Sequence, residues 1–283
     1  MYRLLVWTSK GGTGKTTTVA NTAPELARLG YRVLMVGFDP QADLESTFGI
    51  EEDSDVTRIE ELLDDGGDPL AAAVNIEVPP LPRRVNRRRR DSRGRLQLLP
   101  CSSQLLSHTA AIARRGYQDL ERLMQAFDSQ ADLALIDTQG ALTPISHTAA
   151  RAADGVLFVG EPGYYEFRAL ASRLAELDQL RRDESLEIDP IGLLFVRSAA
   201  RSRQMREYRE HYENPEAFGG DPLYIFEAHT RQQSSVRDHP RVQRPTVIVE
   251  PDSHVAHDYR AFAAELVDHL AVIAHGEQHE HAA

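Results

Sequence analysis

The only two lysines of this chain lie within one eight-residue segment, although its 283 residues include 32 lysines and arginines combined. The segment reads Lys10-Gly11-Gly12-Thr13-Gly14-Lys15-Thr16-Thr17. A lysine ammonium is a compact charge on a thin stem and can reach a phosphate through a tight loop, whereas a planar guanidinium needs more room. Glycines in the same loop let backbone N–H groups converge on phosphate oxygens. The composition and spacing therefore predict a phosphate-binding loop.

The loop fits the pattern Gly-x-x-x-x-Gly-Lys-[Ser/Thr], except that Ser9 stands at the usual first glycine and Lys10 follows it. In such loops the lysine before the hydroxyl residue holds the β- and γ-phosphates, and the hydroxyl ligates Mg²⁺. We therefore expect Lys15 to bind phosphate and Thr16 to bind Mg²⁺. The extra lysine at the start makes the loop a deviant Walker A motif.

The segments on either side of the loop have the patterns that it requires. Tyr2–Thr8 is typical of a buried strand, and Thr16–Leu29 predicts a helix whose positive N-terminal end points at a bound anion. Pro24 lies inside this helix, where a proline removes a hydrogen bond and costs about 3 kcal/mol. We expect a kink or an irregularity at Pro24.

With these motifs and several others, the chain resembles the ParA/MinD group of deviant Walker ATPases, and within it the ParA partition ATPases. The resemblance extends from residue 2 to about residue 270. The other matching segments are Leu29–Ala42 with its Asp39-Pro40-Gln41 sequence, Leu133–Thr138, Ala152–Val159, Arg244–Val247, Pro251–Ser253 and Tyr259–Leu266.

The resemblance implies roles for individual residues. Lys10 matches the lysine that crosses the interface of an ATP-sandwich dimer to the partner's nucleotide. Asp39 matches the carboxylate that orients the attacking water and supports the Mg²⁺ shell, although a turn-forming Asp before a proline is the alternative interpretation. Asp137 matches the Walker B acid, and a carboxylate that ends an apolar strand lies at the sheet edge where ligands bind. The implied ligands are ATP and Mg²⁺.

Three positions depart from the family pattern. Gly37 stands where the family often has a first Asp, Thr8 where it usually has Asn, and Gln139 where the Walker B acid region usually continues with Pro. We expect slow hydrolysis from these departures.

The alternation of predicted strands and helices indicates an α/β fold, namely a single P-loop domain with a mostly parallel, twisted sheet covered on both faces. We expect this domain to occupy residues 1–274, followed by a flexible, polar, His-rich tail at 275–283. Further strands are expected at Leu96–Leu99, Ile191–Val196, Leu223–Phe226 and Thr246–Val249. Further helices are expected at Tyr117–Phe127, Pro144–Ala153, Phe167–Leu180, Arg201–Tyr212 and Val255–Ile273.

Composition excludes several classes of protein. The sequence contains no apolar run of the roughly 18 residues that a membrane span needs, and we expect no signal peptide because the predicted first strand begins at Tyr2. The single cysteine, Cys101, excludes an internal disulfide and argues against an iron–sulfur protein. We therefore expect a cytoplasmic protein. His275, His279 and His281 could form a metal site, but a polar tail is the favoured interpretation.

Charge is strongly segregated along the chain. The net charge is −11, yet the run from Arg83 to Arg95 carries eight arginines and one acid, which leaves −18 on the remainder. The run lies in a proline-led segment, residues 79–95, that is typical of an exposed loop. Such a loop could bind the phosphate backbone of DNA without reading its sequence, through Arg87, Arg88, Arg89 and Arg90. A loop that is only solvated or internally paired is the equal alternative.

The resemblance also implies a second basic site, because ParA proteins bind DNA nonspecifically through basic residues near the dimer edge. Arg201, Arg203 and Arg231 lie near the matching segments, although each could be an ordinary surface arginine.

The resemblance thus implies a nucleoid-associated partition ATPase for a plasmid, a chromosome or another cargo. ATP would close a homodimer that binds DNA, and a ParB-like partner would trigger hydrolysis and release. A weakly hydrolysing or nonhydrolysing DNA-binding scaffold is an alternative. A MinD-like membrane ATPase is a further alternative, but no Lys or Arg follows Arg260 to give the basic amphipathic tail that membrane binding needs.

Overall fold

The computed structural model describes residues 1–8, 12–82, 94–198, 207, 209–210, 223–232 and 242–280, with only the backbone of residues 184 and 275–280. The strands are β1 (Tyr2–Trp7), β2 (Arg32–Phe38), β3 (Val74–Ile76), β4 (Arg95–Leu99), β5 (Leu133–Thr138), β6 (Gly155–Gly160), β7 (Asp189–Ser198) and β8 (Ile225–Arg231). The helices are α1 (Lys15–Leu29), α2 (Asp43–Thr47), α3 (Ile59–Asp65), α4 (Pro69–Ala72), η1 (Ser103–His108), α5 (Thr109–Arg114), α6 (Asp119–Gln125), α7 (Pro144–Arg151), α8 (Tyr164–Glu184), α11 (Thr246–Val249) and α12 (His254–Glu280).

Within these residues the strands form one eight-stranded sheet in the order β3-β4-β2-β5-β1-β6-β7-β8. Every neighbouring pair is parallel except β3 and β4, which are antiparallel. Val6 of β1 and Gly37 of β2 both pair in register with Asp137 of β5. The carboxyl ends of these three strands therefore meet at one place on the sheet edge.

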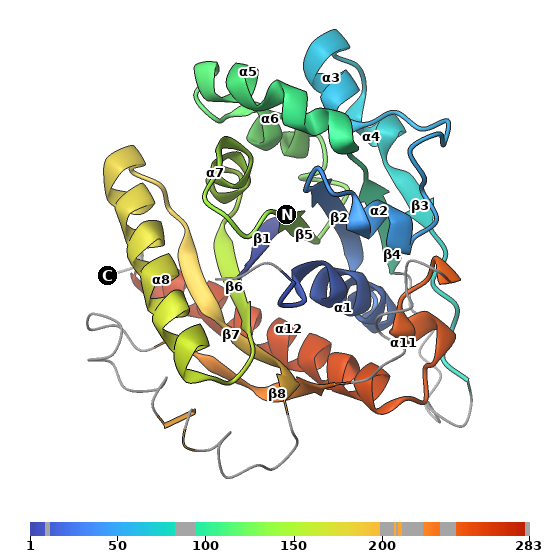
Figure 1. The fold of residues 1–283 in the computed structure, drawn as a ribbon. Helices are drawn as coiled ribbons and strands as arrows, with labels where there is room; N and C mark the ends of the chain where they lie inside the picture. The colour runs from blue at the N-terminus through green and yellow to red at the C-terminus, as the bar shows by residue number, and fades with distance from the viewer. Residues whose placement is uncertain are drawn as a thin grey trace.

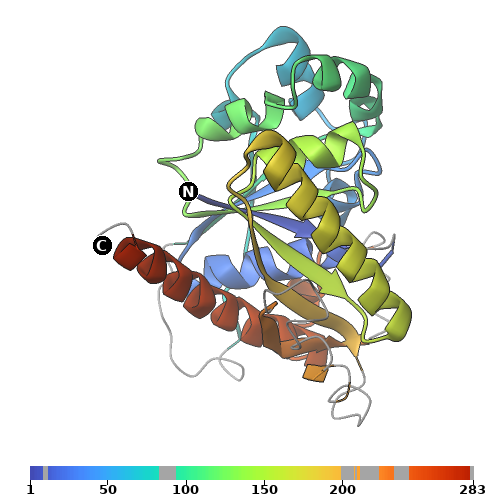
Figure 2. The ribbon, with the colours of Figure 1, turned by 90° about the vertical axis from the view of Figure 1, so that its left-hand side faces the viewer.

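Helices cover both faces of the sheet, and Figures 1 and 2 show the two layers with the sheet between them. One core lies under α1, α11 and α12, and the other lies under α5, α6, α7 and α8. Side chains of β1 alternate between them, since Leu4 and Val6 enter the first core while Leu5 and Trp7 enter the second. The predicted fold class, a mostly parallel sheet with helices on both sides, is confirmed.

Thr246–Val249, which we predicted to be a strand, is the helix α11. Its β-branched residues favour a strand, but tertiary contacts outweigh that preference. Pro245 precedes the helix with a φ of −71°, and the Val247 N–H donates to the side chain of Asn21 on α1 at 3.1 Å. Asn21 is fully buried, so this hydrogen bond fixes α11 against α1.

Two other boundaries, and the course of α1 at Pro24, differ from the expectations. The strand predicted at Leu223–Phe226 is β8, which begins at Ile225 and extends to Arg231. Helix α1 is unbroken through Pro24, because the buried face that contains this residue packs into the core. The backbone of α12 continues to Glu280, so the predicted flexible tail is helical in its first residues, in keeping with the good helix propensity of Glu and Gln there.

The predicted helix Arg201–Tyr212 falls mostly outside the described residues. In the part of the chain that is described, no helix combines the length and the apolar character needed to span a membrane.

Candidate functional site

The glycine loop after β1 leads directly into α1. Gly12 and Gly14 have φ values of +75° and +92°, a left-handed conformation that strains any side chain larger than that of glycine. Thr8 at the end of β1 shares a 2.6 Å hydrogen bond with Thr13, and both side chains are buried. This bond ties the loop to the strand. Lys10 and Gly11 lie outside the described residues.

Lys15 and Thr16 form the first turn of α1, after Gly14 as its N-cap. The first turn contains no acidic residue, so the positive end of the helix is available to an anion. The Thr16 hydroxyl donates a hydrogen bond to the carboxylate of Asp137, and Lys15 acts on the same carboxylate by its charge. The loop and the end of β5 are thereby joined.

Asp137 is a buried carboxyl group, with 1% of its surface exposed. Burial raises its pKa to about 7, against the opposing effects of the Thr16 hydrogen bond and the Lys15 charge. Its Oδ1 atom has no hydrogen-bond partner among the described residues. A buried oxygen of this kind needs a ligand to satisfy it, and a cation would do so.

Asp39 begins a tight loop after β2. Its Oδ1 accepts from the Gln41 N–H at 3.1 Å, and its carbonyl accepts from the Ala42 N–H at 2.9 Å. The Cys101 thiol, which follows β4, donates to the same carbonyl at 3.3 Å. The side chain of Asp39 is therefore held at the carboxyl edge of the sheet, next to Lys15.

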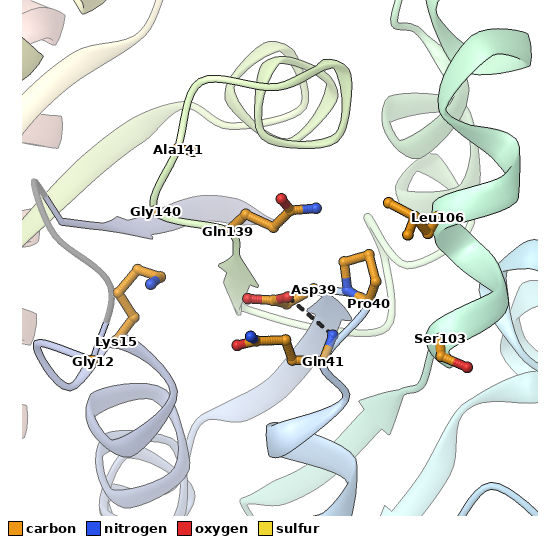
Figure 3. A pocket seen from close by; sticks show the side chains of 10 residues that line it. All are labelled: Gly12, Lys15, Asp39, Pro40, Gln41, Ser103, Leu106, Gln139, Gly140 and Ala141. Carbon is orange, nitrogen blue, oxygen red and sulfur yellow. Dashed lines mark hydrogen bonds between the residues drawn. The ribbon is translucent and has the colours of Figure 1, made fainter.

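A cavity of about 500 Å³ lies between the glycine loop, the Asp39 loop, the segment after β5 and helix η1. In Figure 3, Lys15 lies on one side of it and Leu106 of η1 on the other, with Asp39, Gln41 and Gln139 between them. The volume is within the range of small-ligand sites. The lining residues are Gly12, Lys15, Asp39, Pro40, Gln41, Ser103, Leu106, Gln139, Gly140 and Ala141.

The charges around this cavity favour a divalent cation bound with a phosphate ligand. Burial raises the pKa of Asp43, and the nearby charge of Asp39 raises it further while Lys15 opposes both. Asp137 lies in the same group of mutually repelling acids. Mg²⁺ is commonly held by one or two carboxylates together with substrate phosphates. The residues present fit a magnesium ion held by Thr16 and Asp137, with Asp39 close by.

A family model described as an AAA domain matches residues 3–189. The chain belongs to this AAA domain family. The match and the ParA-type relatives confirm the resemblance to the ParA/MinD group that the motifs indicated. One such relative is the chromosome-partitioning ATPase Soj of Thermus thermophilus, which is 27% identical over 269 residues that cover 94% of this chain and 95% of Soj.

Two solved structures have the same fold as this member of the AAA domain family. A McdA variant of Cyanothece in complex with ATP is 18% identical, with a TM-score of 0.75 and 96% of each chain covered. The cobyrinic acid a,c-diamide synthase of Mycobacterium smegmatis with bound ADP and magnesium is 22% identical, with a TM-score of 0.74 and 96% of each chain covered.

The structure brings part of the predicted site of this family member together. Lys15 and Asp39 line one cavity, and Thr16 and Asp137 are joined by a hydrogen bond beside it. Of the predicted DNA contacts, Arg231 forms an ion pair with Asp258 at 2.5 Å. The others, Arg87–Arg90, Arg201 and Arg203, lie outside the described residues.

Sequence reasoning missed the far wall of the cavity, which Ser103 and Leu106 of η1 provide. Their sequence has no motif that could have indicated them. Gln41 stood out only as part of a family segment, and Gln139 only as a departure from the family pattern, yet both line the cavity. The strand-end position of Gln139, two residues after Asp137, is the signal that could have identified it.

Proposed function

We propose that the cavity at the carboxyl edge of the sheet binds ATP with Mg²⁺ and hydrolyses ATP. The observation that carries the proposal is the convergence of Lys15, Thr16, Asp39 and Asp137 from three parallel strand ends. The lysine at the start of a helix binds the β- and γ-phosphates, beside the positive end of that helix. Mg²⁺ neutralises phosphate charge when bound, and Thr16 and Asp137 would hold it.

Asp39 then orients the attacking water for in-line displacement. Phosphoryl transfer depends on positioning and electrostatic stabilisation more than on covalent chemistry. A carboxylate fixed by the Gln41 N–H, at the border of the cavity, is suited to this task. Hydrolysis without a partner protein is expected to be slow.

We further propose that ATP joins two copies of the chain at this edge, with Lys10 reaching the partner's nucleotide. Large apolar side chains are exposed after three parallel strands of the sheet, β4, β5 and β6, which supports an interface at this edge. They are Leu106 at 62% exposure after β4, Leu142 at 46% after β5, and Tyr164 and Tyr165 at 58% and 72% after β6.

The cargo-related part of the proposal is DNA partition. The dimer would bind nonspecific DNA through arginines, stay on the nucleoid in the cytoplasm, and be released when a ParB-like partner stimulates hydrolysis. The chromosome-partitioning role in the name of the Thermus thermophilus relative supports this choice. A slow or nonhydrolysing scaffold is the second candidate, favoured by Gln139 in the cavity wall. Turnover measured with and without DNA and partner separates the two.

The test of the ATP site compares nucleotide binding in the wild type, Lys15→Ala and Lys15→Arg, with circular dichroism to check folding. The wild type should bind Mg²⁺–ATP, and both variants should lose at least about tenfold in affinity. Lys15→Ala removes the charge that binds phosphate, and Lys15→Arg replaces a compact ammonium with a guanidinium that the loop does not admit. Unchanged ATP binding in Lys15→Ala would refute the site.

A further inference from the structure

The side chain of Glu45 fills the space above Gly37. Glu45 belongs to α2 and is 1% exposed. A Cβ atom added to Gly37 would lie 1.8 Å from Oε1 of Glu45 and 2.7 Å from its Cδ, far inside any real contact. Residue 37 can therefore have a side chain only if Glu45 moves. A side chain at position 37 and the glutamate at position 45 thus exclude each other.

The Glu45 carboxyl group is held by the segment that follows β4. Its Oε1 accepts from the Cys101 N–H at 2.8 Å, in a buried hydrogen bond. The thiol of the same residue donates to the carbonyl of Asp39 at 3.3 Å. Cys101 is fully buried. One residue thus binds both ends of the segment 39–45, which contains the proposed water-orienting Asp39.

Packing alone does not account for a glutamate at this position. Burial raises the pKa of Glu45 to about 7, and the charge of Asp137 raises it further, against the hydrogen bonds from Cys101 and from its own backbone N–H. Burying a carboxyl group costs free energy of folding unless hydrogen bonds compensate for its lost hydration, and an apolar side chain would fill the same volume without that cost. Compared with an apolar side chain of the same size, glutamate provides in addition an oxygen that accepts the hydrogen bond from the Cys101 N–H.

Glu45 lies close to the catalytic edge and outside the cavity wall. Gly37, which it covers, pairs in register with Asp137. The residues that line the cavity do not include Glu45. Its charge acts on Asp137, and its hydrogen-bonded connection to the site runs through Cys101 to Asp39.

We propose that Glu45 is a positioning residue, which accepts the Cys101 N–H and so holds Asp39 in place for ATP hydrolysis. The inference rests on the proposed ATPase function. It also explains Gly37, since the carboxyl group that fills this space comes from α2 and leaves no room for a side chain on β2.

The first test compares Glu45→Gln with Glu45→Met. Both substitutions are neutral and similar in volume, but only glutamine has an oxygen that can accept from Cys101. Glu45→Gln should keep the wild-type kcat within about threefold, whereas Glu45→Met should lose about 10- to 100-fold in kcat with little change in ATP affinity. Equal kcat values in the two variants, or a loss confined to ATP affinity, would overturn the proposal.

The second test moves the carboxyl group to β2. Glu45→Ala should lower kcat, and the double variant Gly37→Asp/Glu45→Ala should recover turnover because the new carboxyl group enters the same space. Gly37→Ala/Glu45→Ala is the matched control, since it adds volume without an acceptor and should not recover. Equal recovery in both double variants would overturn the inference.

These results also separate the inference from the function on which it rests. A wild-type protein that fails to bind ATP overturns both. A wild-type protein that binds and hydrolyses ATP, with normal turnover in Glu45→Met, overturns the positioning role alone.

Discussion

Replacing Asp137 by Asn should raise the stability of the ligand-free protein and abolish ATP hydrolysis. The folded-state pKa of this carboxyl group is about 7, raised from 3.8 chiefly by burial. Between these two pH values the folded protein keeps a proton that the unfolded chain has released. Stability is therefore lost as pH rises from about 4 to about 7.

The magnitude follows from the size of the shift. The pKa of Asp137 differs by about three units between the folded and unfolded states, which corresponds to roughly 4 kcal/mol of unfolding free energy lost by pH 8. Glu45 titrates in the same range and interacts with Asp137, so the two losses are not additive. We expect Asp137→Asn to recover about 3 kcal/mol at pH 8, which is roughly 6 °C in Tm for a chain of this size.

The assay is thermal unfolding of the wild type and Asp137→Asn at pH 5, 6, 7 and 8, without nucleotide or metal. The variant should melt higher at pH 8, and the difference should shrink toward pH 5, where the carboxyl group is protonated and as neutral as the amide. Adding Mg²⁺–ATP should raise the Tm of the wild type only.

Asp132 provides a control with the opposite sign. The hydrogen bond from Arg32 lowers the pKa of Asp132, so this carboxylate contributes stability above its unfolded pKa that is lost only in acid. Asp132→Asn should therefore lower stability to a similar extent across pH 5–8 and leave hydrolysis unchanged. A Tm difference between Asp137→Asn and the wild type that is constant with pH would refute the reasoning, as would an Asp137→Asn variant that melts below the wild type at pH 8.

Three further predictions concern the dimer and DNA. Lys10→Ala should bind ATP as a monomer with near-normal affinity but lose ATP-induced dimerisation in sedimentation analysis, and normal dimerisation would remove its role across the interface. Arg201→Ala/Arg203→Ala should weaken ATP-dependent DNA binding and reduce the slope of log affinity against log salt by about 1 for each DNA phosphate that is no longer neutralised. Arg231→Ala should change that slope less, because Asp258 already neutralises its guanidinium; an equal change would show that this ion pair opens on DNA.

The phosphate-binding half of the site could be predicted from the sequence because its signal is local. The loop from Lys10 to Thr17 requires a strand before it and a helix after it, and both are present as β1 and α1. Asp137 ends an apolar strand, so its place at the carboxyl edge followed from parallel pairing. Such patterns can be interpreted from one sequence because the elements that position the motif are adjacent to it in the chain.

The remaining features depend on contacts between residues distant in sequence. Thr246–Val249 has the composition of a strand, and its helix depends on Asn21, more than two hundred residues earlier. Glu45 lies over Gly37 because the five-residue helix α2 directs the Glu45 side chain toward the sheet, where its carboxyl group accepts a hydrogen bond from the Cys101 N–H. Neither arrangement has a periodicity that a single sequence reveals.

The most direct test of the account is the mass of the wild-type protein in solution with Mg²⁺–ATP and with Mg²⁺–ADP, followed by DNA binding under the same two conditions. We expect a dimer and salt-sensitive DNA binding with ATP, and a monomer with weak DNA binding with ADP. A protein whose mass and DNA affinity are the same with either nucleotide would contradict it.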